Sequence, residues 1–147
     1  MQDVIIKKAE TDSELAQVFK LREIVFIKGQ NVPEKRERDK YDSSANHFLL
    51  LVKNKPVGCA RVRFYTENLA KIAKIERVAI LGAYQKTGLG KMLMDYIVNF
   101  CKSERAKEAH LNSQLYAKDF YIKCGFKPYG ETFMDAGIEH IAMFRTL

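Results

Sequence analysis

Cysteine is scarce in this sequence: the 147 residues contain three copies, Cys59, Cys101 and Cys124. Their number is odd and their spacing is not that of metal ligands, so buried free thiols are the simplest interpretation. No apolar run approaches the ~18 residues that a membrane-spanning helix needs, and the start of the chain shows no signal-peptide pattern. We therefore expect a cytoplasmic protein that does not associate with membranes and binds no metal.

Acidic residues are outnumbered by lysine and arginine, 18 to 25, which gives a formal net charge of +7. Such a surface suits a negatively charged partner, for which nucleic acid and a ligand with several phosphates are both candidates. The basic residues are dispersed, however, and no run is both basic and aromatic. Nucleic acid is thus the less favoured partner, and a solvated basic surface is the plainest alternative.

The sequence also lacks internal repeats, low-complexity tracts and any composition shift that would mark a domain boundary. Residues 1–147 are therefore expected to form a single domain. The apolar patterns predict a strand, a helix, three strands, a helix, a strand, a helix and two strands. The polar segment 31–44 is a loop or a short second helix, and a loop there is a candidate substrate-binding segment.

Residue patterns typical of turns and helix caps mark the ends of several of these elements. Thr11-Asp12-Ser13-Glu14 is a capping box that begins the first helix, and Gly29 ends it. Asn54-Lys55-Pro56 predicts the turn of a β-hairpin. Asn112-Ser113 predicts the cap of the last helix.

The stretch from Lys74 to Lys91 organises the rest of the chain. It opens as a strand of mostly β-branched residues, and a long amphipathic helix begins at Gly88. The first turn of a helix carries unpaired N–H groups and a partial positive charge. Gly88 and Gly90 would let an anion approach that backbone, and Lys86 and Lys91 add full charges. The stretch is a candidate pyrophosphate site, with a simple tight turn as the structural alternative.

Two familiar phosphate motifs do not fit this stretch. A P-loop needs Ser or Thr after Gly90-Lys91, where Met92 stands, and the dinucleotide fingerprint needs a third glycine. Instead, Gln85-x-x-Gly88-x-Gly90 resembles the coenzyme A pyrophosphate loop of the GNAT N-acetyltransferase superfamily.

Three further segments carry the same resemblance. Phe120-Tyr121-Ile122-Lys123-Cys124-Gly125-Phe126 is similar to the signature of the family's last helix. Leu21-Arg22-Glu23 with Val32-Pro33, Asp39, Asp42 and His47-Phe48 resembles the ElaA-type and YjcF-type branch. Gly137-Ile138-x-His140-Ile141-x-Met143 supports that branch and also resembles the tail of glyphosate-type N-acetyltransferases.

The resemblance implies the GNAT (acyl-CoA N-acyltransferase) fold, an α/β architecture with a mixed, mostly antiparallel sheet, a splayed central strand pair and flanking helices. It implies acetyl-CoA as cosubstrate and direct transfer of an acetyl group to an amine. Backbone N–H groups near Val78 or Ala79 would polarise the thioester carbonyl. The residues implied for coenzyme binding are Val78, Ala79, Ile80, Gln85, Lys86, Thr87, Gly88, Leu89, Gly90, Lys91 and Asn112.

Catalytic roles are implied for three side chains. Tyr121 matches the family's general acid for the leaving thiolate, although it could be one more packed aromatic residue, and Tyr116 is its rival. An amine with a pKa near 10.4 is mostly protonated at neutral pH, so a base is valuable. His140 is the first candidate for this base and Glu76 the second, and base-free or water-relayed catalysis is the remaining alternative.

The acceptor is expected to be a primary amine of a small molecule. Arg77 matches an arginine that contacts an anionic substrate in glyphosate-type enzymes, although it could equally be a surface residue. Gln114 stands where those enzymes carry another arginine, which disfavours a phosphonate. The alternatives are a protein N-terminal or lysine acetyltransferase, a non-catalytic acyl-CoA-binding module and a basic nucleic-acid-binding domain. A homodimer is the expected assembly.

Overall fold

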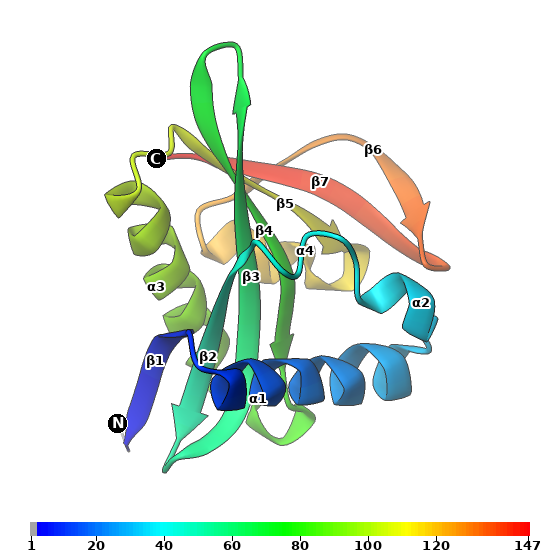
Figure 1. The fold of residues 1–147 in the computed structure, drawn as a ribbon. Helices are drawn as coiled ribbons and strands as arrows, with labels where there is room; N and C mark the ends of the chain where they lie inside the picture. Colours follow the sequence, from blue (N-terminus) through cyan, green and yellow to red (C-terminus); the bar gives the residue numbers. More distant parts are fainter. Residues whose placement is uncertain (1–2) are drawn as a thin grey trace. The chain divides into compact units, whose positions relative to one another are not determined.

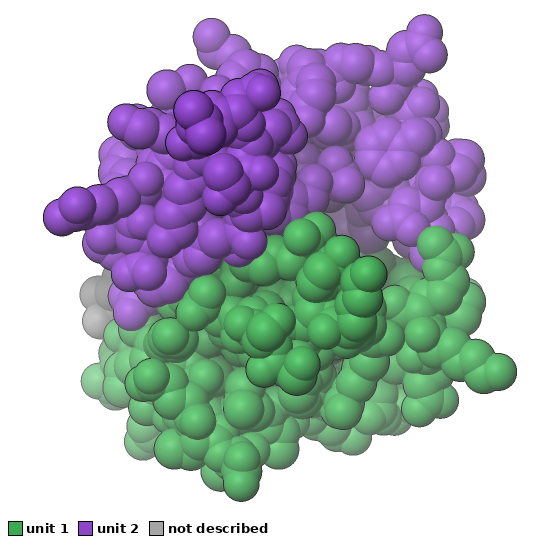
Figure 2. Space-filling view, turned by 45° about the horizontal axis from the view of Figure 1, so that its top comes forward, with its two compact units in different colours: residues 1–63, 77–93 green, residues 64–76, 94–147 purple. Residues whose placement is uncertain are grey.

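The computed structural model describes residues 3–147, and its hydrogen-bonded strands follow the order β1-β2-β3-β4-β5-β7-β6 (Figure 1). The β1–β2, β2–β3, β5–β7 and β6–β7 pairs are antiparallel, and β4–β5 is parallel. The predicted mixed, mostly antiparallel α/β sheet is therefore confirmed. The chain forms two compact units, residues 1–63 with 77–93 (unit 1) and residues 64–76 with 94–147 (unit 2), which Figure 2 colours separately.

Unit 1 holds the N-terminal elements together with the end of β4 and the start of α3. A π-helical turn follows α1, and a 3-10 turn, Gly82–Tyr84, follows β4. Its elements are β1 (Val4–Ala9), α1 (Asp12–Arg22), the π-helix Glu23–Lys28, α2 (Glu34–Glu37), β2 (Asn46–Val52), most of β3 (Lys55–Glu67), the end of β4 (Ala70–Ile80) and the start of α3 (Leu89–Ser103).

Unit 2 holds the remaining parts of β3, β4 and α3 and all of the C-terminal elements. Its pairing of β4 with β5 joins Ile72, Ala73 and Lys74 to Glu108, Ala109 and His110, near the start of both strands. Its other elements are β5 (Glu108–Gln114), the 3-10 turn Leu115–Ala117, α4 (Lys118–Lys123), β6 (Lys127–Asp135) and β7 (Ile138–Thr146).

The capping box at the start of α1 forms as predicted. The Thr11 hydroxyl accepts a hydrogen bond from the Glu14 N–H over 3.1 Å, and the Glu14 carboxylate accepts one from the Thr11 N–H over 3.0 Å. Glu14 also pairs with Lys7 of β1, which ties the start of the helix to the first strand. The helical run passes through the π-helix and Gly29 and ends at Gln30, one residue beyond the predicted end.

Two local predictions are wrong in detail. The first hairpin turns at Lys53 and Asn54, both with positive φ, because Lys55 already pairs with Val52 in the ladder. Asn112 and Ser113 do not cap a helix, since they lie inside β5 and pair with Ala142 and Ile141 of β7. The last helix begins instead at Lys118, after the 3-10 turn.

Each unit has its own buried apolar residues. In unit 1 these include Val18 and Leu21 of α1, which pack with Leu49, Cys59 and Ala79 of the strands. Buried side chains of unit 2 include Ile97, Cys101, Leu111, Phe126 and Met143. All three cysteines are free and buried, as predicted, and burial raises the pKa of the Cys59 and Cys101 thiols to about 12.

Candidate active site

The loop between β4 and α3 is fastened to the strand that precedes it. The Gln85 side-chain amide donates a hydrogen bond to the Ile80 carbonyl over 3.0 Å, and the Gln85 N–H donates to the Gly82 carbonyl over 3.2 Å. The Thr87 hydroxyl donates to the Tyr84 carbonyl. These bonds bring two predicted coenzyme-binding stretches, Val78–Ile80 and the loop from Gln85, together within unit 1.

The glycine at the start of α3 has the conformation that an anion cradle needs. Gly88 has a φ of +87°, and a Cβ built on it would meet no heavy atom within 4 Å, so the space above its backbone is open. The Met92 N–H donates to the Gly88 carbonyl over 3.1 Å, and the Leu89 and Gly90 N–H groups come before it in the first helical turn. Those groups form the positive end of the helix. With the exposed Lys86 and Lys91, the loop fits a pyrophosphate.

The end of β4 lies close against β3. The Leu81 N–H donates to the Val57 carbonyl over 2.9 Å. A Cβ on Gly58 would lie 2.7 Å from Ile80 Cδ1 and 3.2 Å from the Ala79 carbonyl oxygen, so only glycine fits there without a shift. This close approach holds residues 79–81 against β3 in unit 1.

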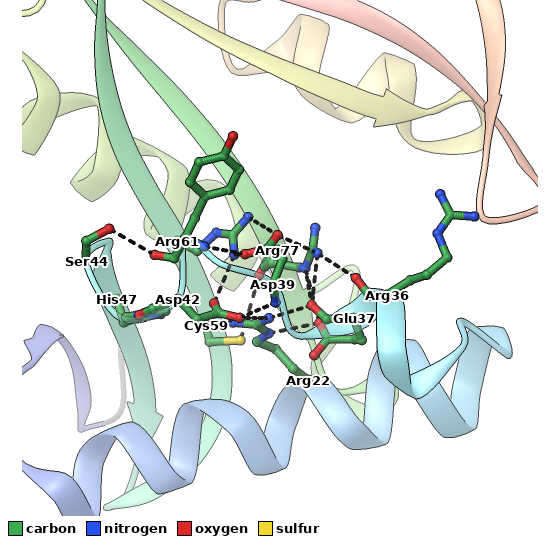
Figure 3. Close-up of polar contacts among 11 residues, drawn as sticks. Arg22, Arg36, Glu37, Asp39, Asp42, Ser44, His47, Cys59, Arg61 and Arg77 are labelled. Atoms are coloured by element: carbon green, nitrogen blue, oxygen red, sulfur yellow. Dashed lines mark hydrogen bonds and ion pairs between the residues drawn. The ribbon is translucent and has the colours of Figure 1, made fainter.

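Six charged side chains of unit 1 form a network that sequence reasoning did not predict (Figure 3). Arg22 is fully buried, and its guanidinium donates to Glu37 Oε2 over 2.9 Å and to Asp42 Oδ1 over 2.7 Å. It also donates to the Glu37 carbonyl over 2.9 Å. The sequence indicated this network only in part, because Arg22 and Asp42 were identified solely as residues that resemble a branch of the family.

Two further arginines complete this network. Arg61, also buried, donates to Asp39 Oδ1 over 2.7 Å and to Asp42 Oδ1 over 2.9 Å. Arg77 of β4 lies 3.2 Å from Glu37 Oε2 and donates to Asp39 Oδ2 over 3.2 Å. The three guanidinium groups balance three carboxylates, which is what buried charges require. We call these residues the arginine–acid network: Arg22, Glu37, Asp39, Asp42, Arg61 and Arg77.

The network also favours the ionised form of two of its carboxylates, Asp39 and Asp42. Burial alone would raise the pKa of Asp42, but hydrogen bonds from Arg22, the Asp39 N–H and Arg61 outweigh it, and the net pKa lies well below the ordinary range. The pKa of Asp39 is lowered in the same way, with Arg61 and the Tyr41 N–H opposing desolvation. Near them, burial lowers the pKa of His47, whose Nε2–H donates to the Asp42 carbonyl over 2.8 Å.

Tyr121, the predicted acid, lies on α4 in unit 2. Its ring packs edge-on against Phe120, at a centroid distance of 5.0 Å, and against Phe126, at 6.4 Å. Desolvation raises the pKa of the phenol above its ordinary value, with smaller contributions from Cys124 and Tyr116. A phenol is protonated at neutral pH even at its ordinary pKa of about 10, so the hydroxyl has the proton that a donor needs.

The C-terminal end of α4 is fixed by contacts around Gly125. The Phe126 N–H donates to the Tyr121 carbonyl over 3.0 Å, and the Gly125 N–H donates to the Ile122 carbonyl over 2.9 Å, with Gly125 at a φ of +92°. The Arg145 guanidinium donates to the Cys124 carbonyl over 2.7 Å. This cation at the helix end complements its dipole and holds the turn that carries Tyr121.

His140, the first candidate base, is a buried residue of β7 in unit 2. Its Nδ1–H donates to the Ile138 carbonyl over 2.7 Å, which leaves Nε2 as the nitrogen with an acceptor lone pair. The ring stacks on Phe133, at a centroid distance of 5.8 Å and an interplanar angle of 24°. In the neutral imidazole, this tautomer presents Nε2 as the proton acceptor.

The other predicted site residues divide between the two units. Glu76 is half-buried on β4 in unit 2, and Arg77, the next residue, belongs to unit 1. Asn112 is exposed on β5. Gln114, two residues further along the strand, pairs with His140 of β7. Because side chains alternate between the two faces of a sheet, Asn112 and His140 lie on the same face. Arg77 is bound into the arginine–acid network rather than extended into solvent.

Such a sheet, with a glycine loop leading into a long helix, points to an N-acetyltransferase. Residues 11–147 match the acetyltransferase (GNAT) domain family, and the chain belongs to this family. The uncharacterized N-acetyltransferase YjcF of Bacillus subtilis is 33% identical over 93% of this chain and 96% of its own. Protein ElaA of Escherichia coli is 29% identical over 90% and 88%. The predicted ElaA-type and YjcF-type relationship is thereby confirmed.

Solved structures agree on the fold. The crystal structure of Escherichia coli ElaA has a TM-score of 0.84 and 27% identity over 99% of both chains. A GNAT acetyltransferase of Elizabethkingia anophelis, solved with acetyl-CoA bound, has a TM-score of 0.75 and 18% identity over the full length of both chains. The GNAT fold predicted from the sequence is confirmed.

Neither a metal centre nor a membrane helix is found in the described part of the chain. Within residues 3–147, no group of three or more His, Cys, Asp and Glu side chains is arranged to hold a metal ion. No helix in the same range is long and apolar enough to cross a membrane.

Proposed function

We propose that this acetyltransferase transfers the acetyl group of acetyl-CoA to a primary amine of a small molecule. The open, left-handed Gly88 at the start of α3 carries the proposal, because it leaves the helix N-terminus accessible to a pyrophosphate. The relative from Elizabethkingia anophelis, which has the same fold, was solved with acetyl-CoA bound.

The coenzyme would be held by backbone groups of unit 1. The N–H groups from Lys86 to Gly90 would bind the pyrophosphate, and Lys86 and Lys91 would add charge attraction. When bound, acetyl-CoA supplies an activated thioester carbonyl. The Val78 and Ala79 N–H groups would donate hydrogen bonds to the carbonyl oxygen, which gains negative charge as the amine attacks.

Tyr121 would act as the general acid. Formation of the carbon–nitrogen bond breaks the carbon–sulfur bond, and the sulfur leaves as a thiolate unless a proton reaches it. A phenol has that proton at neutral pH because its ordinary pKa is about 10, and desolvation raises the pKa of Tyr121 further. Its hydroxyl proton would pass to the sulfur, and solvent would restore it.

His140 would accept the proton that the amine loses. A lysine-like amine is about 3.4 pKa units above neutrality, which makes its deprotonated form cost roughly 4.6 kcal/mol at pH 7. The Ile138 carbonyl keeps the His140 proton on Nδ1, so Nε2 can accept another. Glu76 is the second candidate for this role.

Calorimetric titration with acetyl-CoA and with coenzyme A tests the first part of the proposal. Dissociation constants of about 1–100 μM for both ligands would support the loop assignment, and no binding up to about 1 mM would refute it. Thiol release from acetyl-CoA would then be followed with four probes: a diamine, an aminosugar, an amino acid and a lysine-containing peptide. Turnover of the peptide alone would overturn the small-molecule assignment in favour of a protein acetyltransferase.

A further inference from the structure

The strand β4 contains a residue in a conformation that strands do not normally hold. Arg77 has a φ of +54°, in the left-handed region, although it is neither glycine nor asparagine and lies inside Ala70–Ile80. A left-handed residue bends a strand locally and changes the direction in which the following backbone groups point. Such a conformation is strained for a side chain with a Cβ and persists only when surrounding contacts enforce it.

The Arg77 side chain is itself bound by several contacts (Figure 3). Its Nε and Nη2 donate to the Glu37 carbonyl over 3.1 and 2.9 Å, and Nη2 donates to the Arg36 carbonyl over 3.3 Å. The Glu37 and Asp39 carboxylates add two ion pairs at 3.2 Å. One guanidinium therefore binds the backbone and the side chains of the segment around α2.

The segment that accepts these bonds is itself held by buried arginines. Arg22 donates to both the carboxylate and the carbonyl of Glu37, and Arg61 donates to both oxygens of Asp39. The two arginine side chains are 0% and 1% exposed. The Arg22–Glu37 pair is the better shielded from solvent, because the Glu37 side chain is 3% exposed and the Asp39 side chain 29%. Arg77 thus binds to acceptors in a fixed position, and its own backbone is fixed in turn.

We propose that Arg77 is a positioning residue, which holds the bend in β4 that aims the Val78 and Ala79 N–H groups at the thioester carbonyl. This inference rests on the proposed acetyl-CoA chemistry. It replaces the expectation that Arg77 contacts an anionic substrate, because its guanidinium donates to carbonyls and carboxylates of its own unit. The carbonyl of Arg77 is also occupied, as the acceptor of a long contact of 3.9 Å from Cys59 Sγ.

Two substitutions separate this role from the alternatives. Arg77→Ala and Arg77→Gly remove the same guanidinium, but only glycine adopts the left-handed conformation without steric cost. Arg77→Ala should lower kcat about 100-fold, as a misplacement on the scale of an ångström does, and Arg77→Gly should retain at least about ten times the kcat of Arg77→Ala. Both should bind coenzyme A within about threefold of the parent chain, because the Gln85–Gly90 loop is intact.

The matched control is Arg36→Ala. Arg36 is exposed, its side chain points away from the network in Figure 3, and it contributes only its backbone carbonyl to Arg77. This variant should retain the parent kcat. Arg77→Lys keeps the charge but not the forked donors, and its kcat should lie below that of the parent, which gives a second test if Arg77→Ala fails to fold.

A spectroscopic measurement detects the hydrogen bonds to the thioester carbonyl and needs no acceptor amine. Infrared difference spectra of acetyl-CoA carrying a ¹³C-labelled carbonyl should show a lower carbonyl frequency bound to the parent and to Arg77→Gly than bound to Arg77→Ala. Equal kcat and equal carbonyl frequencies in the Ala and Gly variants would overturn the proposal, as would an unchanged kcat in Arg77→Ala. Failure of the proposed function would look different, because the parent chain itself would then not bind acetyl-CoA.

Discussion

Gln85 and Ile80 are joined by a hydrogen bond of 3.0 Å from the side-chain amide to the backbone carbonyl. The bond closes the loop between β4 and α3 onto the end of the strand. It connects the part of the backbone proposed for the thioester to the part proposed for the pyrophosphate. The contribution of this bond to coenzyme binding can be tested by mutation.

Gln85→Ala should weaken the binding of acetyl-CoA. Loss of one neutral hydrogen bond costs about 0.5–1.5 kcal/mol, which corresponds to an increase of roughly 2- to 13-fold in the dissociation constant. Gln85→Glu should weaken binding further, since a carboxylate cannot donate to the Ile80 carbonyl and repels phosphate. Calorimetry measures both, and Gln17→Ala, which removes an amide from α1, is the control. An unchanged dissociation constant in Gln85→Glu would contradict the loop assignment.

Gly88→Ala should destabilise the protein by about 1–2 kcal/mol through its backbone alone. A Cβ at Gly88 meets nothing within 4 Å, so steric overlap contributes nothing, and the cost comes from the φ of +87°. Gly82→Ala is the matched control, because its Cβ also meets nothing within 4 Å and its φ is not in the left-handed region. Urea unfolding should separate the two variants, and equal midpoints would contradict the strain argument.

Tyr121→Phe should lower kcat by at least about 100-fold while leaving the affinity for acetyl-CoA unchanged, because general acid catalysis acts on the chemical step. The control is Tyr116→Phe, which removes a hydroxyl from a side chain that is 79% exposed. Thiol release with the best amine measures kcat. If Tyr116→Phe loses the activity and Tyr121→Phe keeps it, the acid has been assigned to the wrong tyrosine.

His140→Ala should remove the acidic limb of the pH–rate profile. A general base on Nε2 stops working once that nitrogen is protonated, so kcat/KM of the parent should fall as the pH is lowered, and the variant should be slower and flatter. Glu76→Gln tests the second candidate in the same assay. An acidic limb that persists in His140→Ala and disappears in Glu76→Gln would transfer the role to Glu76.

Arg22→Met should destabilise the protein by about 3–5 kcal/mol at neutral pH, because it leaves the Glu37 and Asp42 carboxylates without their main partner. Lys20→Met is the control, since Lys20 is exposed and its pairing with Glu23 spans 3.8 Å. Urea unfolding at pH 7 measures the difference between them. A loss below about 1 kcal/mol for Arg22→Met would mean that the buried pairs contribute no more than surface pairs do.

The same network should make stability depend on pH. The folded-state pKa values of Asp39 and Asp42 are depressed, so the stability that these groups contribute is present above their unfolded pKa, about 3.9. It is lost as the pH falls below that value toward the folded pKa values. The destabilisation caused by Arg22→Met should therefore shrink between pH 5 and pH 2, and a constant difference would contradict this.

The sequence predicted the features that depend on neighbouring residues. The Thr11–Glu14 capping box, the glycine loop and the periodicity of α3 are all set within a few positions. The helix cap predicted at Asn112-Ser113 was wrong because asparagine and serine cap helices but also occur in strands. Here the pairing with β7 makes these residues part of a strand. Local pattern alone cannot include a partner strand that lies about thirty positions further on.

The arginine–acid network lay beyond this kind of reasoning for the same reason. Its members come from α1, the segment around α2, β3 and β4, so nothing in their spacing marks them as partners. The resemblance to a branch of the family identified Arg22, Asp39 and Asp42 but did not indicate what these residues do. For Arg77 the resemblance suggested a substrate contact, with a surface residue as the alternative, and neither included the contacts of its side chain with Glu37 and Asp39.

The balance of charge within the network has an evolutionary consequence. Replacing one member leaves an uncompensated buried charge, whereas replacing an arginine together with its acid by apolar residues of similar volume need not be destabilising. Arg22 and Asp42, which share two hydrogen bonds, should therefore be inherited or lost as a pair. Among homologous sequences, correlated substitution at these two positions is the expected signature, and Arg77 should change together with Glu37.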